Sequence, residues 1–465
     1  MDPDSSTSST PVTAGIDRSR LEALTERELK RFVSDHPVSQ EYSRRAQRSL
    51  VSGVPMPWMM RWASGFPPFA AHANGATIVD VDGHKYVDLC LGDTGAMTGH
   101  GPAAVVAALR QQLEHGLTMM LPTADSFEVA EELSRRFGLG RWQFTLSATD
   151  ANRMALRLAR QITGRRKVLV FSYCYHGSVD EAFAVRQADG TTTSRAGNVG
   201  PAVDPAVTTT AVEFNDLSAL ADALADRSIA CVMAEPAMTN MGIILPDAGY
   251  HDALREITSS AGTLLLIDET HTLSAGPGGC TKAWGLEPDM VTLGKAIGSG
   301  VACGALGVSE DVAERMLAQP DADYEDTGGV GGTLAGNAFS LKAMRTTLSE
   351  VLTPEAYERM IPLASRFSRG VMDVVDAFGL DWNVTELGCR AEYRFQPTPA
   401  RNGTDGWLAA DPALERYLHL HAMNRGVLIT PFHNMALMSP QTTAASVDRH
   451  TEVFREAVAD LLAAS

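Results

Sequence analysis

The chain has 465 residues, 45% of them hydrophobic, and a mean hydropathy of -0.07, so it can bury a large core and exceeds what one small domain needs. Its formal net charge of -17 and pI near 5.1 argue against binding to a nucleic-acid backbone, which depends on clustered basic residues. We therefore expect small-molecule chemistry or protein contacts, without nucleic acid as a partner.

The start of the chain predicts a polar tail followed by a helix. Residues 1–16 lack the basic start and the hydrophobic stretch of a signal peptide, and we expect them to be disordered. A helical pattern follows over Asp17–Val33, while the Pro-, Met- and Trp-rich segment Ser52–Phe69 has no regular period. We expect residues 17–75 to join a smaller domain, with Ser52–Phe69 wrapping a surface or lining a pocket.

The middle of the chain predicts a large domain over residues 76–335. Two strands, Ala76–Val81 and Tyr86–Leu91, flank a hairpin turn at Asp82-Gly83. Helical stretches then alternate with short apolar runs, which is typical of an α/β domain with a mostly parallel central sheet. These runs are Lys167–Phe171, Ile229–Ala234, Thr263–Ile267, Met290–Leu293 and Ala302–Val308.

The end of the chain, residues 336–465, predicts a smaller α+β domain. Helical patterns cover Phe339–Phe378 with a break near Pro354. A strand at Ala391–Phe395, a helix, a strand at Gly426–Thr430 and a final helix follow.

Neither a membrane span nor a metal centre is indicated. No apolar run approaches the roughly 20 residues that cross a bilayer. The six cysteines are widely scattered, which favours reduced thiols in a cytoplasm over a disulfide framework. The histidines lack metal-ligand spacing, and we expect no metal.

Asp268 directly follows the apolar run Thr263–Ile267, at the predicted carboxyl end of a strand. Parallel sheets bind their ligands at this end of their strands. A carboxylate there is costly unless it meets a cation or strong donors, and the protonated nitrogen of a pyridine ring is such a partner. In pyridoxal 5'-phosphate (PLP) chemistry that contact keeps the ring an electron sink. The alternative is an aspartate that caps a helix.

Lys295 follows the next run, between Gly294 and Gly298, with no acidic neighbour in the sequence. A partly desolvated lysine loses its proton more easily, which lets it form a Schiff base and then transfer protons. The alternative is a lysine that points into solvent. The pairing with Asp268 favours the catalytic interpretation.

Two further strand ends carry candidate cofactor contacts. Residues 147–152 precede an amphipathic helix, whose free N–H groups would bind a phosphate or, alternatively, only need an N-cap. Tyr175 ends another apolar run and would stack on an aromatic ring or simply pack.

Together these motifs resemble the class III aminotransferases of PLP fold type I, and look most similar to glutamate-1-semialdehyde aminomutase and its β-amino-acid and amine transaminase relatives. The resemblance covers nearly the whole chain after the tail. Its motifs include VDVDGHKYVDL, LPTADSFEVAEEL, SATDANRMALRLAR, YHG, EPAMTNMGIILP, IDETHT, TLGKAIGSG, GGTLAGN and GVLITPF.

The resemblance implies PLP as the cofactor and a homodimer with shared active sites. It makes Lys295 the Schiff-base lysine and Asp268 the partner of the pyridine nitrogen. The other implied contacts are Ala148 and Thr149 to the phosphate, Tyr175 and Thr270 to opposite ring faces, Glu235 beneath the substrate, and Thr333 to the neighbouring subunit's phosphate.

The chain departs from the family at the phosphate loop and at the substrate positions. Ala148 stands where relatives have glycine, which matters only if the backbone there needs a positive φ. Met59 stands where the aminomutase has a substrate-binding arginine, and Asp93 where it has a tryptophan. Asp93 would attract an amine or cap a turn.

Arg61 and Arg390 are candidates for binding a substrate carboxylate, with surface salt bridges as the alternative. Trp58 and Met59 would line an apolar pocket wall, or belong to the core.

These observations predict a transaminase that moves an amino group from a primary amine or a β- or ω-amino acid to a keto acid or ketone. The runner-up is an intramolecular aminomutase of the glutamate-1-semialdehyde type. An NAD-dependent dehydrogenase is disfavoured because no GxGxxG follows an early strand, and a non-catalytic scaffold because Asp268 and Lys295 are both present.

Overall fold

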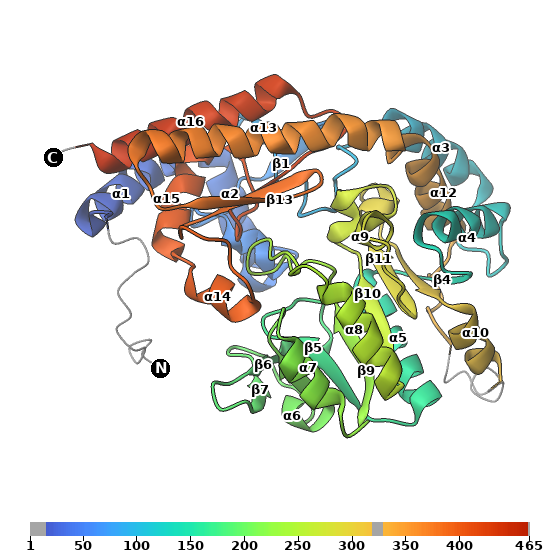
Figure 1. Ribbon diagram of the computed structural model, residues 1–465. Helices are drawn as coiled ribbons and strands as arrows, with labels where there is room; N and C mark the ends of the chain where they lie inside the picture. The colour runs from blue at the N-terminus through green and yellow to red at the C-terminus, as the bar shows by residue number, and fades with distance from the viewer. Residues whose placement is uncertain (1–14, 319–328, 464–465) are drawn as a thin grey trace.

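The computed structural model describes residues 15–318 and 329–463 (Figure 1). Residues 1–14 of the expected tail lie outside this part of the chain. Ile16 is buried in the main core, so ordered structure begins just before the predicted boundary at residue 17.

A seven-stranded sheet forms the centre of the larger part. In spatial order its strands are β4 (Arg141–Thr145), β12 (Gly304–Val308), β11 (Met290–Gly294), β10 (Leu264–Asp268), β9 (Ile229–Ala234), β5 (Lys167–Phe171) and β8 (Thr209–Val212). Strands β11 to β8 run parallel, and β12 is antiparallel to both its neighbours. The predicted α/β fold with a mostly parallel sheet is confirmed.

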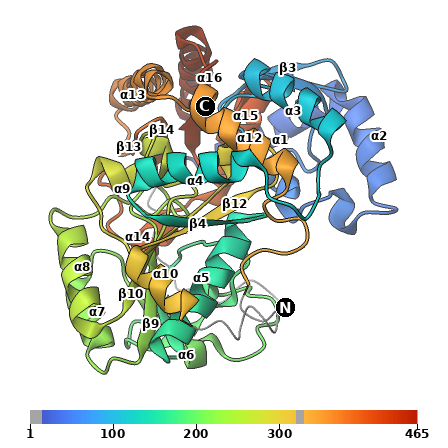
Figure 2. The same cartoon turned by 90° about the vertical axis from the view of Figure 1, so that its right-hand side faces the viewer.

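Helices cover both faces of this sheet, which explains why its central strands β9, β10 and β11 are buried along their whole length. Figures 1 and 2 show α7 (Leu217–Leu224) and α8 (Tyr250–Ala261) on one face and α5 (Ala148–Thr163) on the other. The remaining elements of this part are α3 (Ala103–His115), α4 (Ala124–Phe137), α6 (Pro205–Thr208), α9 (Gly279–Ala283), α10 (Glu310–Leu317), α12 (Ala338–Thr346) and the hairpin β6 (Ala184–Arg186) and β7 (Thr192–Ser194).

Two small sheets build the other part of the molecule. One contains β1 (Ala70–Asn74), β2 (Thr77–Asp80), β3 (Lys85–Asp88) and β15 (Val427–Leu428), and the other β13 (Asn383–Leu387), β14 (Arg390–Arg394) and β16 (Met435–Leu437). The hairpin β2–β3, assigned above to the large domain, shares a sheet with β15, because β3 pairs in parallel with that late strand. The division at residues 76 and 336 stays a prediction.

The helices of the smaller part come from both ends of the chain. They are α1 (Arg18–Asp35), α2 (Pro37–Ala46), α13 (Pro354–Phe378), α14 (Gly403–Leu408), α15 (Pro412–Met423) and α16 (Ala444–Leu462). α13 and α16 lie side by side in Figure 1. The predicted break near Pro354 is a π-helical turn at Thr347–Val351 before the N-cap Thr353. Over residues 15–318 and 329–463, no helix has both the length and the apolar character needed to cross a membrane.

Candidate active site

Asp268 is held at the end of β10 by three donors. Its Oδ2 accepts hydrogen bonds from Asn152 Nδ2 at 2.8 Å and His176 Nδ1 at 2.9 Å, and its Oδ1 accepts from the Thr270 backbone N–H at 3.0 Å. Burial by itself would raise the pKa of Asp268, but these donors, His176 first, lower it to about 2. The carboxylate is therefore charged and fixed in position, as a partner for a protonated ring nitrogen must be.

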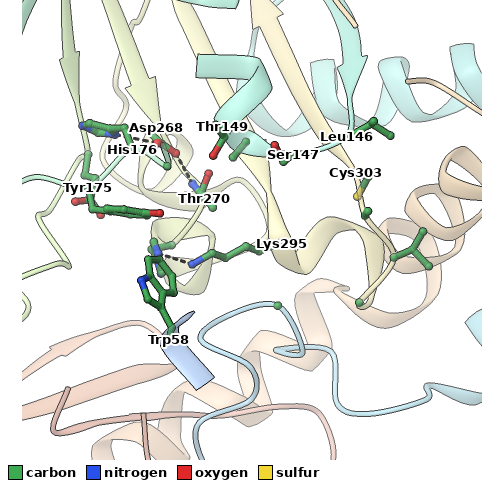
Figure 3. Close-up of a pocket in the computed structure, with 18 residues that line it drawn as sticks. Trp58, Leu146, Ser147, Thr149, Tyr175, His176, Asp268, Thr270, Lys295 and Cys303 are labelled. Carbon is green, nitrogen blue, oxygen red and sulfur yellow. Dashed lines mark hydrogen bonds and ion pairs between the residues drawn. The ribbon is translucent and has the colours of Figure 1, made fainter. Parts of the chain in front are cut away.

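Lys295 enters the same cavity from the end of β11. Its Nζ lies 3.0 Å from Asp93 Oδ2 and 2.7 Å from His271 Nε2. In Figure 3 the side chains of Asp268, Thr270 and Lys295 point into one space, with Tyr175 and Trp58 beside it. The amine and the Asp268 carboxylate thus face one cavity of about 390 Å³, which is within the usual size of small-molecule sites.

The N-terminus of α5 closes the cavity at the end expected to hold a phosphate. Ser147 caps the helix by accepting from the Asp150 N–H at 3.2 Å, and Ala148 and Thr149 line the cavity. Ala148 is the first helical residue and has no positive φ, so replacing glycine here causes no strain. First-turn N–H groups lack partners within their own helix and attract anions.

Gly294 explains how Lys295 comes so near to this helix. A Cβ at Gly294 would lie 2.9 Å from Ala148 Cβ, closer than side-chain atoms pack. Only glycine therefore lets the end of β11 pass against the start of α5. The backbone places the amine of the next residue close to the anion-binding end of α5.

Three more of the predicted cofactor contacts, Tyr175, Thr270 and Glu235, line the cavity as well. Tyr175 meets Trp58 with ring centroids 5.2 Å apart, and Thr270 has a buried hydroxyl without a partner in the described part of the chain. Glu235 also lines the cavity, which combines a fixed carboxylate, an amine, aromatic walls and an anion-binding helix end. This donor set fits PLP, which carries a ring nitrogen, an aldehyde and a phosphate.

Glu235 is buried, and burial raises the pKa of its carboxyl to about 7, although His176 and Thr239 oppose the shift. The folded protein holds this proton more tightly than the unfolded chain, whose ordinary value is 4.5. This tighter binding of the proton adds to the free energy of unfolding. The contribution is fully present below pH 4.5 and is lost as the pH rises through about 7, so the free energy of unfolding falls by about 3 kcal/mol over this range.

Glu235→Gln cannot titrate and is expected to remove this pH dependence from the free energy of unfolding. Urea unfolding of the cofactor-free protein at several pH values between about 5 and 8 would measure it. Parallel stability profiles for the original protein and the variant would contradict the prediction.

A second cavity of about 610 Å³ adjoins the first, because Trp58, Tyr175 and His271 line both. Arg61, Arg195 and Asp93 line only the second. The Arg61 guanidinium lies 4.9 Å from the centre of the Phe432 ring. Burial lowers the pKa of both arginines, and the charge of Arg195 lowers that of Arg61 further, against an opposing effect of Glu415.

Three predicted site residues lie elsewhere. Met59 is 41% exposed and lines neither cavity. Arg390 is fully buried behind the site, where its Nε donates to Ser274 Oγ at 3.0 Å and its Nη2 to Thr94 Oγ1 at 2.7 Å. These contacts explain why it cannot reach a substrate. Thr333 is exposed, away from this chain's own cavity.

Sequence reasoning missed Asn152, His176 and His271 as site residues. Each stands inside a motif noted above, but the contact partners of these residues are far along the chain. Thr292 Oγ1 donates to Asn152 Oδ1 at 2.6 Å, which turns the Asn152 amide so that its nitrogen donates to Asp268. The sequence did offer one signal for these three residues: they are polar side chains near strand ends, at positions where no helix cap is needed.

Within residues 15–318 and 329–463, one group of possible metal ligands lies outside the site, although no metal was expected. His36, Asp80 and His84 bring their ligand atoms within 4.8 Å of one another. The hydroxyl of Tyr86 already lies 2.7 Å from both His36 Nε2 and Asp80 Oδ2. These three residues therefore form a hydrogen-bonded network with Tyr86.

Comparison with known proteins extends the likeness to nearly the whole chain. Residues 59–458 match the family aminotransferase class-III. A glutamate-1-semialdehyde 2,1-aminomutase from Methanothermobacter thermautotrophicus is 33% identical over 428 residues, covering 91% of this chain and 98% of that protein.

Solved structures of the same family also resemble this chain over most of its length. That of a glutamate-1-semialdehyde-aminomutase from Pseudomonas aeruginosa PAO1 has a TM-score of 0.93 and 46% identity, covering 96% of this chain and all of that one (100%), and a variant of it was solved in complex with PMP. An omega-transaminase from Sphaerobacter thermophilus has a TM-score of 0.83 and 28% identity, covering 91% of this chain and 98% of that one. The chain therefore belongs to the class-III aminotransferases, and it is a PLP-dependent enzyme.

Proposed function

We propose that this enzyme is an aminomutase that moves an amino group within one small carboxylated substrate, of the glutamate-1-semialdehyde type. The 46% identity to the Pseudomonas aeruginosa aminomutase over nearly the full chain carries this proposal. The curated relatives support it, since those at 31–33% identity bear the same name. The runner-up from the sequence thus becomes the main interpretation.

Intermolecular transamination is the second candidate. Met59 in place of the expected arginine favours it, as does the likeness to the omega-transaminase. A transaminase of this kind would take a primary amine or a β- or ω-amino acid as donor and a keto acid or ketone as acceptor.

In either reaction the residues around the first cavity have the same proposed roles. Bound PLP supplies a ring that withdraws electrons from the carbon bearing the amino group. Lys295 holds the cofactor covalently, then accepts the proton of that carbon on Nζ and returns it. Asp268 keeps the ring nitrogen protonated, and the N–H groups of Ala148 and Thr149 bind the phosphate.

The side walls complete this arrangement. Tyr175 and Thr270 lie against opposite faces of the ring, and Glu235 lies beneath the substrate. Because Glu235 keeps its proton up to about pH 7, it adds little negative charge near the substrate. Thr333 donates to the phosphate bound by the partner subunit.

Arg61 and Arg195 are proposed to bind the substrate carboxylate. The Arg61 and Arg195 guanidinium groups line one cavity and, being of like charge, repel each other, and an anion between them relieves that repulsion. Trp58 separates this anionic end from the ring site and packs against the substrate chain.

Arg61→Gln is therefore expected to raise KM for a carboxylated substrate by roughly 10- to 100-fold, the effect of losing one charged hydrogen bond. KM for an amine of the same length without a carboxylate should stay unchanged. Steady-state kinetics with this substrate pair would measure it, with Arg359→Gln, on the surface of α13, as the control. An equal rise in KM for both substrates would contradict a carboxylate role.

The need for a second substrate distinguishes the two candidate reactions. An aminomutase converts glutamate-1-semialdehyde into its amino-shifted isomer with no added acceptor, whereas a transaminase stops after one half-reaction. Product formation should thus exceed the enzyme concentration many-fold without a keto acid. Turnover that depends on an added keto acid or ketone would replace the aminomutase by the transaminase.

A homodimer is also proposed, supported by exposed apolar residues between α3 and α4. Met120 and Leu121 are 78% and 75% exposed, and Leu117 and Met119 lie beside them. Burying such a patch against a second copy is favourable. Light scattering on the purified enzyme should give about twice the chain mass of 49.7 kDa, and Met120→Arg should shift it toward the single chain. A single-chain mass before mutation would exclude the dimer.

A cytoplasmic location is proposed as well. All six cysteines are buried free thiols. Reducing compartments keep such thiols reduced, whereas oxidising ones favour disulfides.

A further inference from the structure

The Lys295 amine has two hydrogen-bond acceptors that come from different parts of the chain. Asp93 Oδ2 lies 3.0 Å from Nζ and His271 Nε2 lies 2.7 Å from it. In this structure the Lys295 ammonium is paired with Asp93. Once Lys295 has lost one proton for the reaction, the neutral amine has two N–H bonds and one lone pair. When both N–H bonds are donated, the lone pair has one direction left.

The state of His271 follows from its surroundings. Burial and the charge of Lys295 hold the pKa of His271 well below its usual range, so the ring is neutral. Since Nε2 accepts from Lys295, Nδ1 carries the proton and donates to Thr94 Oγ1 at 3.0 Å. Arg390 Nη2 also donates to this hydroxyl, which fixes the Thr94 side chain.

The charged groups around this pair are defined. The pKa of His271 is shifted by its neighbours Lys295, Asp93, Arg390 and Asp268. The pKa of Asp93 is shifted by Lys295, His271 and His433. Among these groups, the Asp93 carboxylate is the negative charge in direct contact with the Lys295 amine.

The backbone is strained at both ends of the Asp93–Lys295 contact. Four successive residues have positive φ, namely Leu91 at 45°, Gly92 at 58°, Asp93 at 50° and Thr94 at 81°. Lys295 itself has a φ of 51°. Non-glycine residues rarely adopt this conformation, and such strain persists where the surrounding structure enforces it. The left-handed turn at 91–94 presents Asp93 to Lys295 and Thr94 to His271.

We infer that Asp93 and His271 are positioning residues that aim the lone pair of the free Lys295 amine into the cavity. In the reaction this lone pair takes the proton of the substrate carbon, and the electron pair left behind is held by substrate and cofactor. Asp93 stabilises the ammonium charge that Lys295 then carries, until the proton is returned. The inference rests on the proposed role of Lys295 but not on the choice between aminomutase and transaminase.

The test follows covalent capture of PLP by Lys295, which requires no substrate. Cofactor-free protein is mixed with PLP, and the absorbance of the lysine-linked cofactor is followed in time. His271→Leu and Asp93→Ala remove an acceptor and are expected to slow linkage about tenfold or more. His271→Gln and Asp93→Asn keep an acceptor oxygen and should link at nearly the original rate.

A second readout separates charge from orientation. The pH midpoint of the linked-cofactor absorbance should fall by about one unit or more in Asp93→Asn, because the carboxylate no longer stabilises the protonated linkage. In His271→Gln the midpoint should not move, since a neutral acceptor replaces a neutral acceptor.

Unchanged linkage rates in His271→Leu and Asp93→Ala would overturn the inference, and so would His271→Gln if it were as slow as His271→Leu. Should either apolar variant fail to fold, the Asp93→Asn midpoint decides, and an unmoved midpoint counts against the inference. Failure of substrate turnover with intact linkage would instead count against the proposed function.

Discussion

Lys295→Ala is expected to lower turnover by roughly 10⁴-fold or more, because it removes both the covalent attachment of the cofactor and the base. Among the residues that the structure describes, Lys295 is the one lysine that lines this cavity. The absorbance of lysine-linked PLP should be absent, while the cofactor can still bind through α5.

Turnover and absorbance are measured against Lys85→Ala, which removes an exposed lysine on β3. The fold of the Lys295 variant should persist, as shown by a cooperative thermal transition. Its Asp93 loses the cation that stabilises it, so the pKa of Asp93 should rise. Substantial turnover with a normally folded variant would refute the assignment of Lys295.

Asp268→Asn is expected to slow proton abstraction by about 10³-fold, the usual effect of removing one preorganised charge contact in an active site. Asn152, His176 and the Thr270 N–H all donate to the present carboxylate, and an amide has a single oxygen to accept. The variant thus loses the negative charge that keeps the ring nitrogen protonated. It also leaves one buried donor unpaired, which lowers the free energy of unfolding by about 1–3 kcal/mol.

Single-turnover measurements with a substrate deuterated at the reacting carbon check this prediction. The isotope effect should grow as proton transfer becomes the slow step, while PLP stays bound. Asp289→Asn serves as control, since Asp289 also accepts a backbone N–H in this sheet but lies outside both cavities. An unchanged half-reaction rate would remove Asp268 from its role.

Much of the first cavity could be anticipated. The predicted residues that line it are Trp58, Ala148, Thr149, Tyr175, Glu235, Asp268, Thr270 and Lys295. Glu235, Asp268 and Lys295 come at the ends of apolar runs, and parallel strands bring their carboxyl ends to one edge, so a one-dimensional pattern implies the proximity of these three residues. The family, the fold and the cofactor expected from those motifs are confirmed.

The substrate side was harder to anticipate. The sequence pattern placed Met59 at a substrate position, yet the 3₁₀ turn at Pro57–Arg61 brings Arg61 to the cavity and leaves Met59 exposed. Arg390 was a reasonable candidate, but it donates to Ser274 and Thr94 inside the core. Arg195 had no local signal at all.

The sequence by itself determined the strand periodicity, the anion-binding start of α5 and the residues at the strand ends, because these depend on neighbours along the chain. Only the tertiary structure decided which distant side chains meet. Asp93 lies 202 positions from Lys295, and Asn152 lies 116 from Asp268. Such contacts depend on a left-handed turn and on side-chain directions set by packing, which local patterns do not encode.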